Sequence, residues 1–524
     1  MPKTTRDFKL KFLGTLPKTK KLFPQQIVGL SAILTYKGLS LDAIYQKLKK
    51  KGENIDRKIQ FLLRESSLRG HASLATTPVF CFQFEGSKFL DSALTGLVFS
   101  SSLMASGRRT HTRFDDIIFP EEIYQKKEAK KNYEKTSKDL ISFFDYLLDK
   151  GVKKDEASKI LPYGIYGTGI IQMSVESIVS LKKEYEREKN WMPEEVGILL
   201  KKIEEISKKE GFDWLYATRL CAPKEIYPFP NIFKDPKKEN IVRDLREKNL
   251  KTKIISFNLN FTKNLIKKIK SYLKKRNEIF KSLEKIKKEW ILLLRERETI
   301  IRDYNLAFKI KILSSVPWRV WGEKKRHRTC PMIVESIYFC IERAKNVFLK
   351  YKKQIEKEKI SKKILEEIED VFDLPPTIKK NFLFSYLKAS LKSFESYQKL
   401  KNLGIKEKSA LFLIPRALKI DVMQEYDLYN LLCGYFPLRA CSKAEEFLQR
   451  ITWQEINLIK KELEKRKLKA FSELLGPKCF FLGFCPEKNW CPLIKKANKN
   501  YNLHFHQEMF KSLESFYKKF LETI

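Results

Sequence analysis

An internal repeat is the feature that most constrains how this chain of 524 residues can fold. The segment Leu147–Pro162 reads like Leu400–Pro415, and no gap is needed between the glycine and the proline of either copy. Both copies predict a helix that ends at a left-handed glycine cap, a second helix with an acidic first turn, and a proline that breaks it. Each copy also follows a Ser-rich or Arg-rich stretch and precedes another long helix. The sequence therefore predicts two related domains in tandem.

The ends of the repeat and a cluster of prolines set the predicted boundaries. We predict a first domain over residues 1–233, a junction over 234–257, a second domain over 258–493 and a C-terminal helical tail over 494–524. Prolines break regular structure, and four lie at or next to the junction. They are Pro223, Pro228, Pro230 and Pro236.

Hydrophobic periodicity predicts a helix-rich α+β protein with one small antiparallel sheet in each domain. Apolar residues recur with helical spacing over 26–50 and 56–68, whereas 79–84 alternates as a strand does. In the second domain, 264–302 predicts a long amphipathic helix or hairpin, and 305–313 predicts a strand.

The net charge of +41 makes a polyanionic partner worth weighing. Lysines alternate with glutamates over stretches such as 201–210, which is typical of a solvated helix face and makes nucleic acid the second choice of partner. Nine cysteines are too few for a disulfide scaffold in a chain of this length, and six of them lie scattered among apolar residues, which indicates reduced thiols. The apolar runs are too short for a membrane span and the first residues lack a signal peptide's apolar stretch, so we expect a cytoplasmic protein without a membrane partner.

Two stretches carry residue types that are unusual outside phosphate or flavin sites. The later one is Arg326-His327-Arg328, followed by Ser336. The earlier one partly echoes it. It reads Gly70-His71-Ala72-Ser73, then a strand that leads to Gly86-Ser87, then Ser106-Gly107-Arg108.

The order of these elements resembles the flavin-dependent thymidylate synthases, and the resemblance covers most of both halves. The shared order is a Gly-His-x-Ser segment, a strand leading to Gly-Ser, an Arg-His-Arg motif, a Ser-x-Arg, a helix hairpin ending in Leu-Pro and a helix with Leu-Arg. Neither half holds the whole signature, and the losses are complementary. The departures are Gly96-Leu97-Val98 in place of Arg-His-Arg, Thr76-Thr77 in place of Glu-His, Tyr338 in place of the arginine of Ser-x-Arg, and Leu411 in place of the arginine before Leu-Pro.

The resemblance implies roles for individual residues. Arg326, His327, Arg328 and His71 match positions that hold the flavin. A second set matches positions that hold the nucleotide, and arginine suits both because its planar fork pairs with phosphate oxygens. The nucleotide set is Ser106, Arg108, Ser336 and Arg439.

The resemblance also implies an activity and an assembly. Members methylate dUMP to dTMP with methylenetetrahydrofolate and reduced FAD, so FAD, dUMP, folate and NADPH are the expected ligands, although no side chain is assigned as catalytic. Family sites lie between subunits of a homotetramer, so two fused copies imply a homodimer. The alternative is a catalytically inactive paralogue that binds nucleotides or nucleic acid.

A group of cysteines near the end is a separate signal. Cys479, Cys485 and Cys491 stand among Gly and Pro turns, with five residues between neighbours. Such thiols suit a structural zinc or an iron-sulfur centre, and equally reduced structural thiols or one redox pair. The fourth ligand of a metal would be Cys433, Cys441, His504 or His506.

Overall fold

The computed structural model describes residues 3–69, 71–107, 110–222, 228–260 and 262–523. The protein is α+β, with 60% helix, 14% strand and two separate four-stranded antiparallel sheets. The predicted fold class is confirmed.

The first sheet has the strand order β1-β2-β4-β3. Its strands are β1 (Lys9–Leu16), β2 (Val79–Ser87), β3 (Ser100–Met104) and β4 (Tyr166–Ser174). Phe80, Phe82 and Phe84 of β2 are at most 2% exposed, whereas the residues between them are less buried. A strand that buries every second residue has one face on the core, as the alternation predicted.

The second sheet repeats that order as β5-β6-β8-β7. Its strands are β5 (Thr252–Leu259), β6 (Phe308–Pro317), β7 (Met332–Val334) and β8 (Lys419–Asp427). The predicted strand over 305–313 begins later than expected, because Asn305–Ala307 forms a 3-10 turn at the end of the preceding helix. The strand β5 crosses the predicted start of the second domain at residue 258, so both copies open with an equivalent strand.

Helices of the first copy follow the apolar periodicity, with one break. The stretch 26–50 divides at Gly38, which takes the left-handed φ of 63° at the end of α1, and Ser40 then caps α2. The helices are α1 (Pro24–Lys37), α2 (Leu41–Lys50), α3 (Ile55–Leu68), α4 (Ser73–Thr76), α5 (Phe89–Leu94), α6 (Glu121–Gln125), α7 (Lys127–Asp149), α8 (Lys154–Ala157), α9 (Val175–Arg187), α10 (Glu194–Glu210) and α11 (Asp213–Cys221). The predicted junction contains α12 (Ile241–Asp244).

Helices of the second copy include the predicted hairpin, which α13 and α14 form. The first group is α13 (Lys263–Ile279), α14 (Leu283–Tyr304), α15 (Trp318–Lys324), α16 (Ile337–Lys350), α17 (Lys352–Glu356), α18 (Lys362–Val371), α19 (Pro376–Asn381) and α20 (Leu383–Asn402). The second is α21 (Glu407–Ala410), α22 (Leu428–Leu432), α23 (Tyr435–Arg439), α24 (Glu446–Lys465), α25 (Lys469–Ser472), α26 (Cys479–Leu482) and α27 (Leu503–Thr523).

In the part of the chain that the structure describes, no single helix is both long and apolar enough to cross a bilayer. Helices α1 and α2 reach that size only as a pair, which is bent by 97°.

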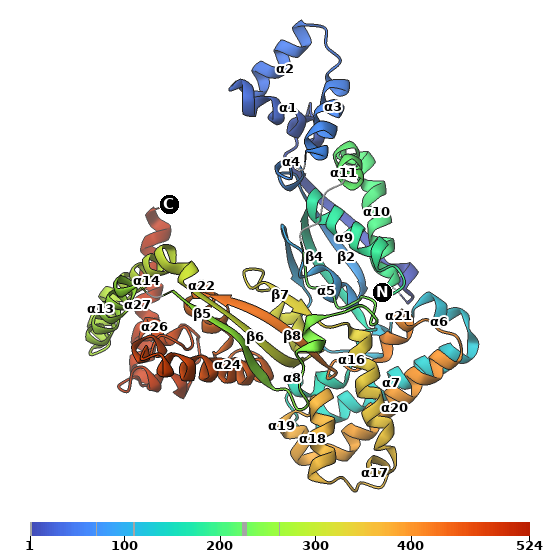
Figure 1. Cartoon of the computed structure of the whole chain (residues 1–524), viewed down its shortest axis with the longest axis vertical. Helices are drawn as coiled ribbons and strands as arrows, with labels where there is room; N and C mark the ends of the chain where they lie inside the picture. The colour runs from blue at the N-terminus through green and yellow to red at the C-terminus, as the bar shows by residue number, and fades with distance from the viewer. Residues whose placement is uncertain (1–2, 70, 108–109, 223–227, 261, 524) are drawn as a thin grey trace. The chain divides into compact units, whose positions relative to one another are not determined.

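The repeated segments meet each other in space. Gly151 and Gly404 have φ values of 75° and 74°, so both predicted left-handed caps are confirmed. The helices before them, α7 and α20, lie side by side (Figure 1). Beyond them Pro162 forms an antiparallel bridge with Pro415, its equivalent in the other copy. Antiparallel pairing of equivalent residues relates these two repeated segments by a local twofold axis.

Contacts divide the chain into two compact units whose boundaries cross the repeat. Unit 1 comprises residues 1–240, 317–328 and 334–420, and unit 2 comprises 241–316, 329–333 and 421–524. Unit 1 thus holds helices of both copies around the Pro162–Pro415 bridge. A buried ion pair also joins the copies there, since Lys159 Nζ lies 2.8 Å from the Asp373 carboxylate and both side chains are 3% exposed.

Candidate functional site

The Arg-His-Arg motif of copy two lies against the matching segment of copy one, within unit 1. Arg326 Nη2 is 3.3 Å from both carboxylate oxygens of Asp91, which α5 carries. Arg328 Nε donates to the Leu97 carbonyl at 3.1 Å. Leu97 occupies the position in copy one that His327 occupies in copy two. The surviving motif therefore contacts the segment that lost it.

Cations surround Asp91 at this contact. The Lys325 ammonium donates to the Asp91 carbonyl and lies 4.5 Å from the ring centre of Trp321. Burial lowers the pKa of Lys325 to about 7, although the Asp91 carboxylate opposes the shift. Burial by itself would raise the pKa of Asp91, but Lys325 and Arg326 hold that pKa below its usual value. Asp91 is therefore a carboxylate that balances part of a cationic site.

Three further cations converge on Gly107, the middle residue of Ser-x-Arg in copy one. A methyl group placed on Gly107 would lie 3.2 Å from Arg416 Nη1, 3.7 Å from Lys88 Nζ and 3.8 Å from Arg319 Nε. We call Lys88, Arg319 and Arg416 the Gly107 cluster. Like charges this close repel one another, so the arrangement is suited to an anion that would sit among them.

Backbone contacts hold the Gly107 cluster in place. Lys88 follows β2 directly, its N–H donates to the Ile165 carbonyl at 2.9 Å, and its stem packs where Gly167 has no side chain. Arg416 follows the repeat's proline, and its Nε donates to the Pro162 carbonyl at 3.1 Å. The Arg319 N–H donates to the Arg416 carbonyl at 3.0 Å. The twofold contact of the copies thus positions all three side chains.

The Gly107 cluster is buried and incompletely satisfied. Lys88 is 8% exposed and Arg416 is 1% exposed. Among the described residues, Lys88 Nζ and Arg416 Nη2 have no hydrogen-bond partner. Burial, assisted by the charge of Arg416, lowers the pKa of Lys88 to about 7, although Asp91 opposes this. Leaving such groups unpaired is costly, so their retention points to a bound partner.

The predicted residues of copy one are not all brought together. Ser106 precedes Gly107 and so adjoins the Gly107 cluster, whereas Arg108 lies outside the described residues. His71 is exposed in the turn before α4. It precedes the start of β2, whereas Lys88 follows its end, and a strand of this length spans about 30 Å. The structure therefore separates His71 from the cluster by the length of β2.

The predicted residues of copy two differ in their surroundings. Ser336 is 4% exposed, and its hydroxyl donates to the Lys234 carbonyl at 2.6 Å at the start of α16. His327 is half-buried between Arg326 and Arg328. Arg439 ends α23 in unit 2, half-buried. In copy two, Ser336 thus binds the backbone of the junction.

The cysteine group does not support the predicted metal. Within the residues that the structure describes, no three His, Cys, Asp or Glu side chains form a group that could hold a metal ion. The suggested ligand His506 is engaged, because Nδ1 lies 2.7 Å from the Tyr501 hydroxyl and Nε2 lies 2.8 Å from the Lys488 carbonyl. Burial raises the pKa of the Cys479 and Cys485 thiols, as in packed structural cysteines. The structural zinc or iron-sulfur centre predicted at Cys479, Cys485 and Cys491 therefore finds no support.

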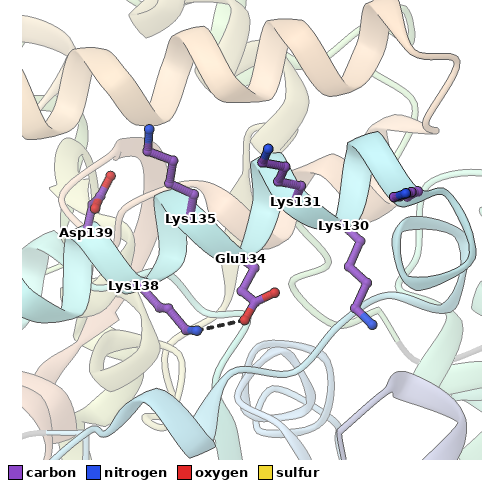
Figure 2. A pocket seen from close by; sticks show the side chains of 7 residues that line it. Lys130, Lys131, Glu134, Lys135, Lys138 and Asp139 are labelled. Atoms are coloured by element: carbon purple, nitrogen blue, oxygen red, sulfur yellow. Dashed lines mark hydrogen bonds and ion pairs between the residues drawn. The ribbon is translucent and has the colours of Figure 1, made fainter.

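A hollow of about 430 Å³ on α7 offers a competing location, but its side chains diverge. All of its lining residues lie on this one helix. Figure 2 shows Lys131 and Lys135 projecting to one side, and Lys130 and Lys138 to the other, with Glu134 paired to Lys138. Side chains that point away from one another do not enclose a ligand, so we do not place the site here.

The three cations of the Gly107 cluster were not predicted from the sequence. Lys88, Arg319 and Arg416 carry no family motif, and lysine and arginine are too common in this chain to stand out. Two of them had a positional signal. Lys88 directly follows the Gly-Ser that ends its strand, and Arg416 directly follows the repeated Leu/Ile-Pro.

Comparisons with known proteins agree with the repeat. The family model described as thymidylate synthase complementing protein matches residues 20–188 and 258–463. The flavin-dependent thymidylate synthase of Pyrococcus abyssi is 30% identical over 129 residues, which are 24% of this chain and 52% of that protein. That of Pyrococcus furiosus is 27% identical over 140 residues, which are 26% and 57%. The chain thus spans about half the length of the curated relatives it matches.

A solved structure is also similar, although weakly. The UMP/dUMP methylase PolB from Streptomyces cacaoi, bound with 5-Br dUMP, aligns with a TM-score of 0.33 and 11% identity, covering 41% of this chain and 95% of that one. That score supports no conclusion about this protein. The family model is different, because its two matches fall in the two predicted domains and together take in well over half of the chain. The chain belongs to the thymidylate synthase complementing protein family and carries that family's domain in tandem.

Proposed function

We propose that the protein is an FAD-dependent enzyme that methylates dUMP to dTMP, with methylenetetrahydrofolate as the carbon donor. The observation that supports it best is the contact of Arg326 and Arg328 with Asp91 and Leu97. The resemblance implies sites that are shared between subunits, and here matching segments of the two copies meet within one chain. One chain can therefore supply both sides of a shared site.

The donor set at this contact suits a cofactor with phosphates. The Arg326 side chain is 40% exposed and its pair with Asp91 is long at 3.3 Å, so the guanidinium could also reach an anionic ligand. We assign Arg326, His327 and Arg328 to flavin. The family pattern also assigns His71, although the length of β2 separates it from Lys88. Bound flavin would supply the hydride and mediate carbon transfer, which side chains cannot do.

The nucleotide is assigned to the residues that the family pattern implies, of which Ser106 adjoins the Gly107 cluster. Ser106 and Arg108 follow from the family pattern, with Ser336 and Arg439 from copy two. Fixed cations near the uracil ring would stabilise negative charge as it develops, and removing one such donor typically costs about 3 kcal/mol in transition-state stabilisation. NADPH as the reductant, a homodimer as the assembly and the cytoplasm as the location complete the proposal.

The test is reconstitution with FAD, followed by gel filtration and measurement of bound flavin absorbance. Arg326→Ala should retain clearly less flavin than the parent protein. Arg302→Ala is the matched control, because Arg302 also pairs with an aspartate, Asp303, at 3.1 Å but lies on α14. No flavin absorbance in the reconstituted parent protein would overturn the proposal.

A binding protein for nucleic acid is the competing proposal, and one surface favours it. Lys263, Lys267, Lys270 and Lys274 are exposed on one face of α13, spaced four, three and four residues apart. Four phosphates neutralised on duplex DNA would give a slope of about −3.6 for log affinity against log salt. Replacing the four lysines by glutamine should flatten that slope. An unchanged slope would remove this alternative.

A further inference from the structure

The Gly107 cluster has a counterpart in the other copy, and the two differ in chemistry. The Arg-His-Arg alignment pairs Lys88 with Trp318 and Phe89 with Arg319. The repeat pairs Tyr163 with Arg416, because each follows the bridging proline. The cluster therefore takes Lys88 from copy one and two arginines from copy two. Its counterpart consists of Trp318, Phe89 and Tyr163.

These three counterparts also converge, but as a packed aromatic group. The ring centres of Tyr163 and Trp318 are 4.3 Å apart, those of Phe89 and Trp318 are 5.5 Å apart, and those of Phe89 and Tyr163 are 5.9 Å apart. Phe89 and Trp318 have no exposed surface, and Tyr163 is 5% exposed. Equivalent positions of the two copies thus converge in two places. They carry cations in one place and aromatic rings in the other.

The residue that matches Gly107 shows the same contrast. It is Ile337, which is fully buried and donates its N–H to the Ile232 carbonyl at 2.9 Å. The adjacent Phe233 packs on the aromatic group, 6.0 Å from Phe89 and 6.4 Å from Trp318. In copy two, the side chain of Ile337 and the end of the first predicted domain, at Ile232 and Phe233, therefore fill the surroundings that Gly107 leaves free of side chain in copy one.

We propose that the Gly107 cluster binds one phosphate group per chain, and that the counterpart site has been replaced by aromatic packing. Three cations around one point, with unpaired donors on Lys88 and Arg416, match the charge and the several acceptor oxygens of a phosphate. Of the nearby acidic groups, Asp91 pairs with Arg326, whereas Glu323 lies 3.2 Å from Arg319 and so balances one cation of the cluster. The unpaired donors of Lys88 and Arg416 remain for the phosphate.

The phosphate has two candidate sources within the proposed function, a nucleotide monophosphate or the pyrophosphate of the flavin. The inference deepens that function by naming what the site recognises, but it does not depend on methyl transfer. Inorganic phosphate is therefore the primary probe, and dUMP and FAD serve as competitors.

The experiment measures binding of inorganic phosphate to the full chain by equilibrium dialysis, for the parent protein and for Lys88→Met. We expect one phosphate per chain and a loss of affinity of about 10- to 100-fold in the variant, as expected for one charge-assisted hydrogen bond. Lys135→Met on α7 is the control, because it removes the same charge from an exposed position. Gly107→Ala is the second variant, since its methyl group would enter the cluster and should also weaken binding.

Competition by dUMP and by FAD identifies which ligand supplies the phosphate. Displacement by dUMP alone assigns the site to the nucleotide, and displacement by FAD alone assigns it to the flavin. Two phosphates per chain, or equal affinities for Lys88→Met and Lys135→Met, would overturn the inference. Phosphate that binds through Lys88 in a protein that never binds FAD would instead uphold the site and remove the proposed enzyme.

Discussion

The Gly107 cluster and its aromatic counterpart are equivalent places in one molecule, and they have diverged in opposite directions. The first buries cations with unpaired donors, which weakens the fold unless an anion binds. The second buries three rings, which stabilises the contact of the two copies. In a symmetric assembly of identical subunits, one substitution would change both places. Fusion into one chain lets one place keep a ligand and the other become core.

Trp318→Ala should have the largest effect on stability, and it tests whether the aromatic group holds the two copies together. The side chain is fully buried and its Nε1 donates to Ser92 Oγ at 3.2 Å, so truncation leaves a cavity and an unpaired hydroxyl. We expect a loss of about 3–5 kcal/mol in the free energy of unfolding, measured by denaturant titration. A loss below about 1 kcal/mol would mean that the aromatic group is not holding the copies together.

Lys88→Met should stabilise the folded protein, by an amount that depends on pH. The folded pKa of about 7 lies below the ordinary lysine value of 10.5, so between these values the unfolded chain binds a proton that the folded one does not. Stability of the parent protein should therefore rise with pH across this window, by about 1.4 kcal/mol per pH unit. The variant lacks this contribution.

The gain in stability of Lys88→Met over the parent protein should thus be greatest below pH 7 and disappear toward pH 10.5. Melting temperatures of both proteins without phosphate, measured at pH 6.5 and 9.5, check this. A constant difference between the two proteins would show that Lys88 keeps an ordinary pKa and already has an anionic partner.

Saturating phosphate should raise the stability of the folded protein by a smaller amount, and mainly in proteins that keep Lys88. A ligand that binds the folded state stabilises it by about 2.7 kcal/mol at a concentration of 100 times Kd. We expect the melting temperature of the parent protein and of Lys135→Met to rise with phosphate, and that of Lys88→Met to rise clearly less. Equal shifts in all three would point to general binding by the basic surface.

Arg326→Ala should have the smallest effect on stability. Its pair with Asp91 is long, and the two side chains are 40% and 27% exposed, so solvent screens it. We expect a change of less than about 1 kcal/mol in unfolding free energy alongside the loss of flavin. A severe loss of stability would make Arg326 a structural residue and not a ligand.

Much of the local structure could be predicted from the sequence. The glycine caps at Gly151 and Gly404 and the hairpin of α13 and α14 follow from glycine conformation and apolar spacing, whereas the break at Gly38 within the predicted stretch 26–50 was not predicted. The start of β6 was placed too early, because a 3-10 turn at the helix end has no apolar pattern of its own. Arg326 and Arg328 could be singled out by motif, but their partners Asp91 and Leu97 could not.

The sequence by itself determined that an ancestral unit was duplicated, that both copies are helix-rich with a small sheet, and which motif letters each copy keeps. Those properties depend on local spacing along the chain. Only the tertiary structure decided which side chains meet across the twofold. Lys88 and Arg416 are more than 300 residues apart in the sequence, and the bridge of Pro162 with Pro415 places them around Gly107. A ligand site made of such distant residues leaves no periodic or compositional mark, because its spacing exists only in three dimensions.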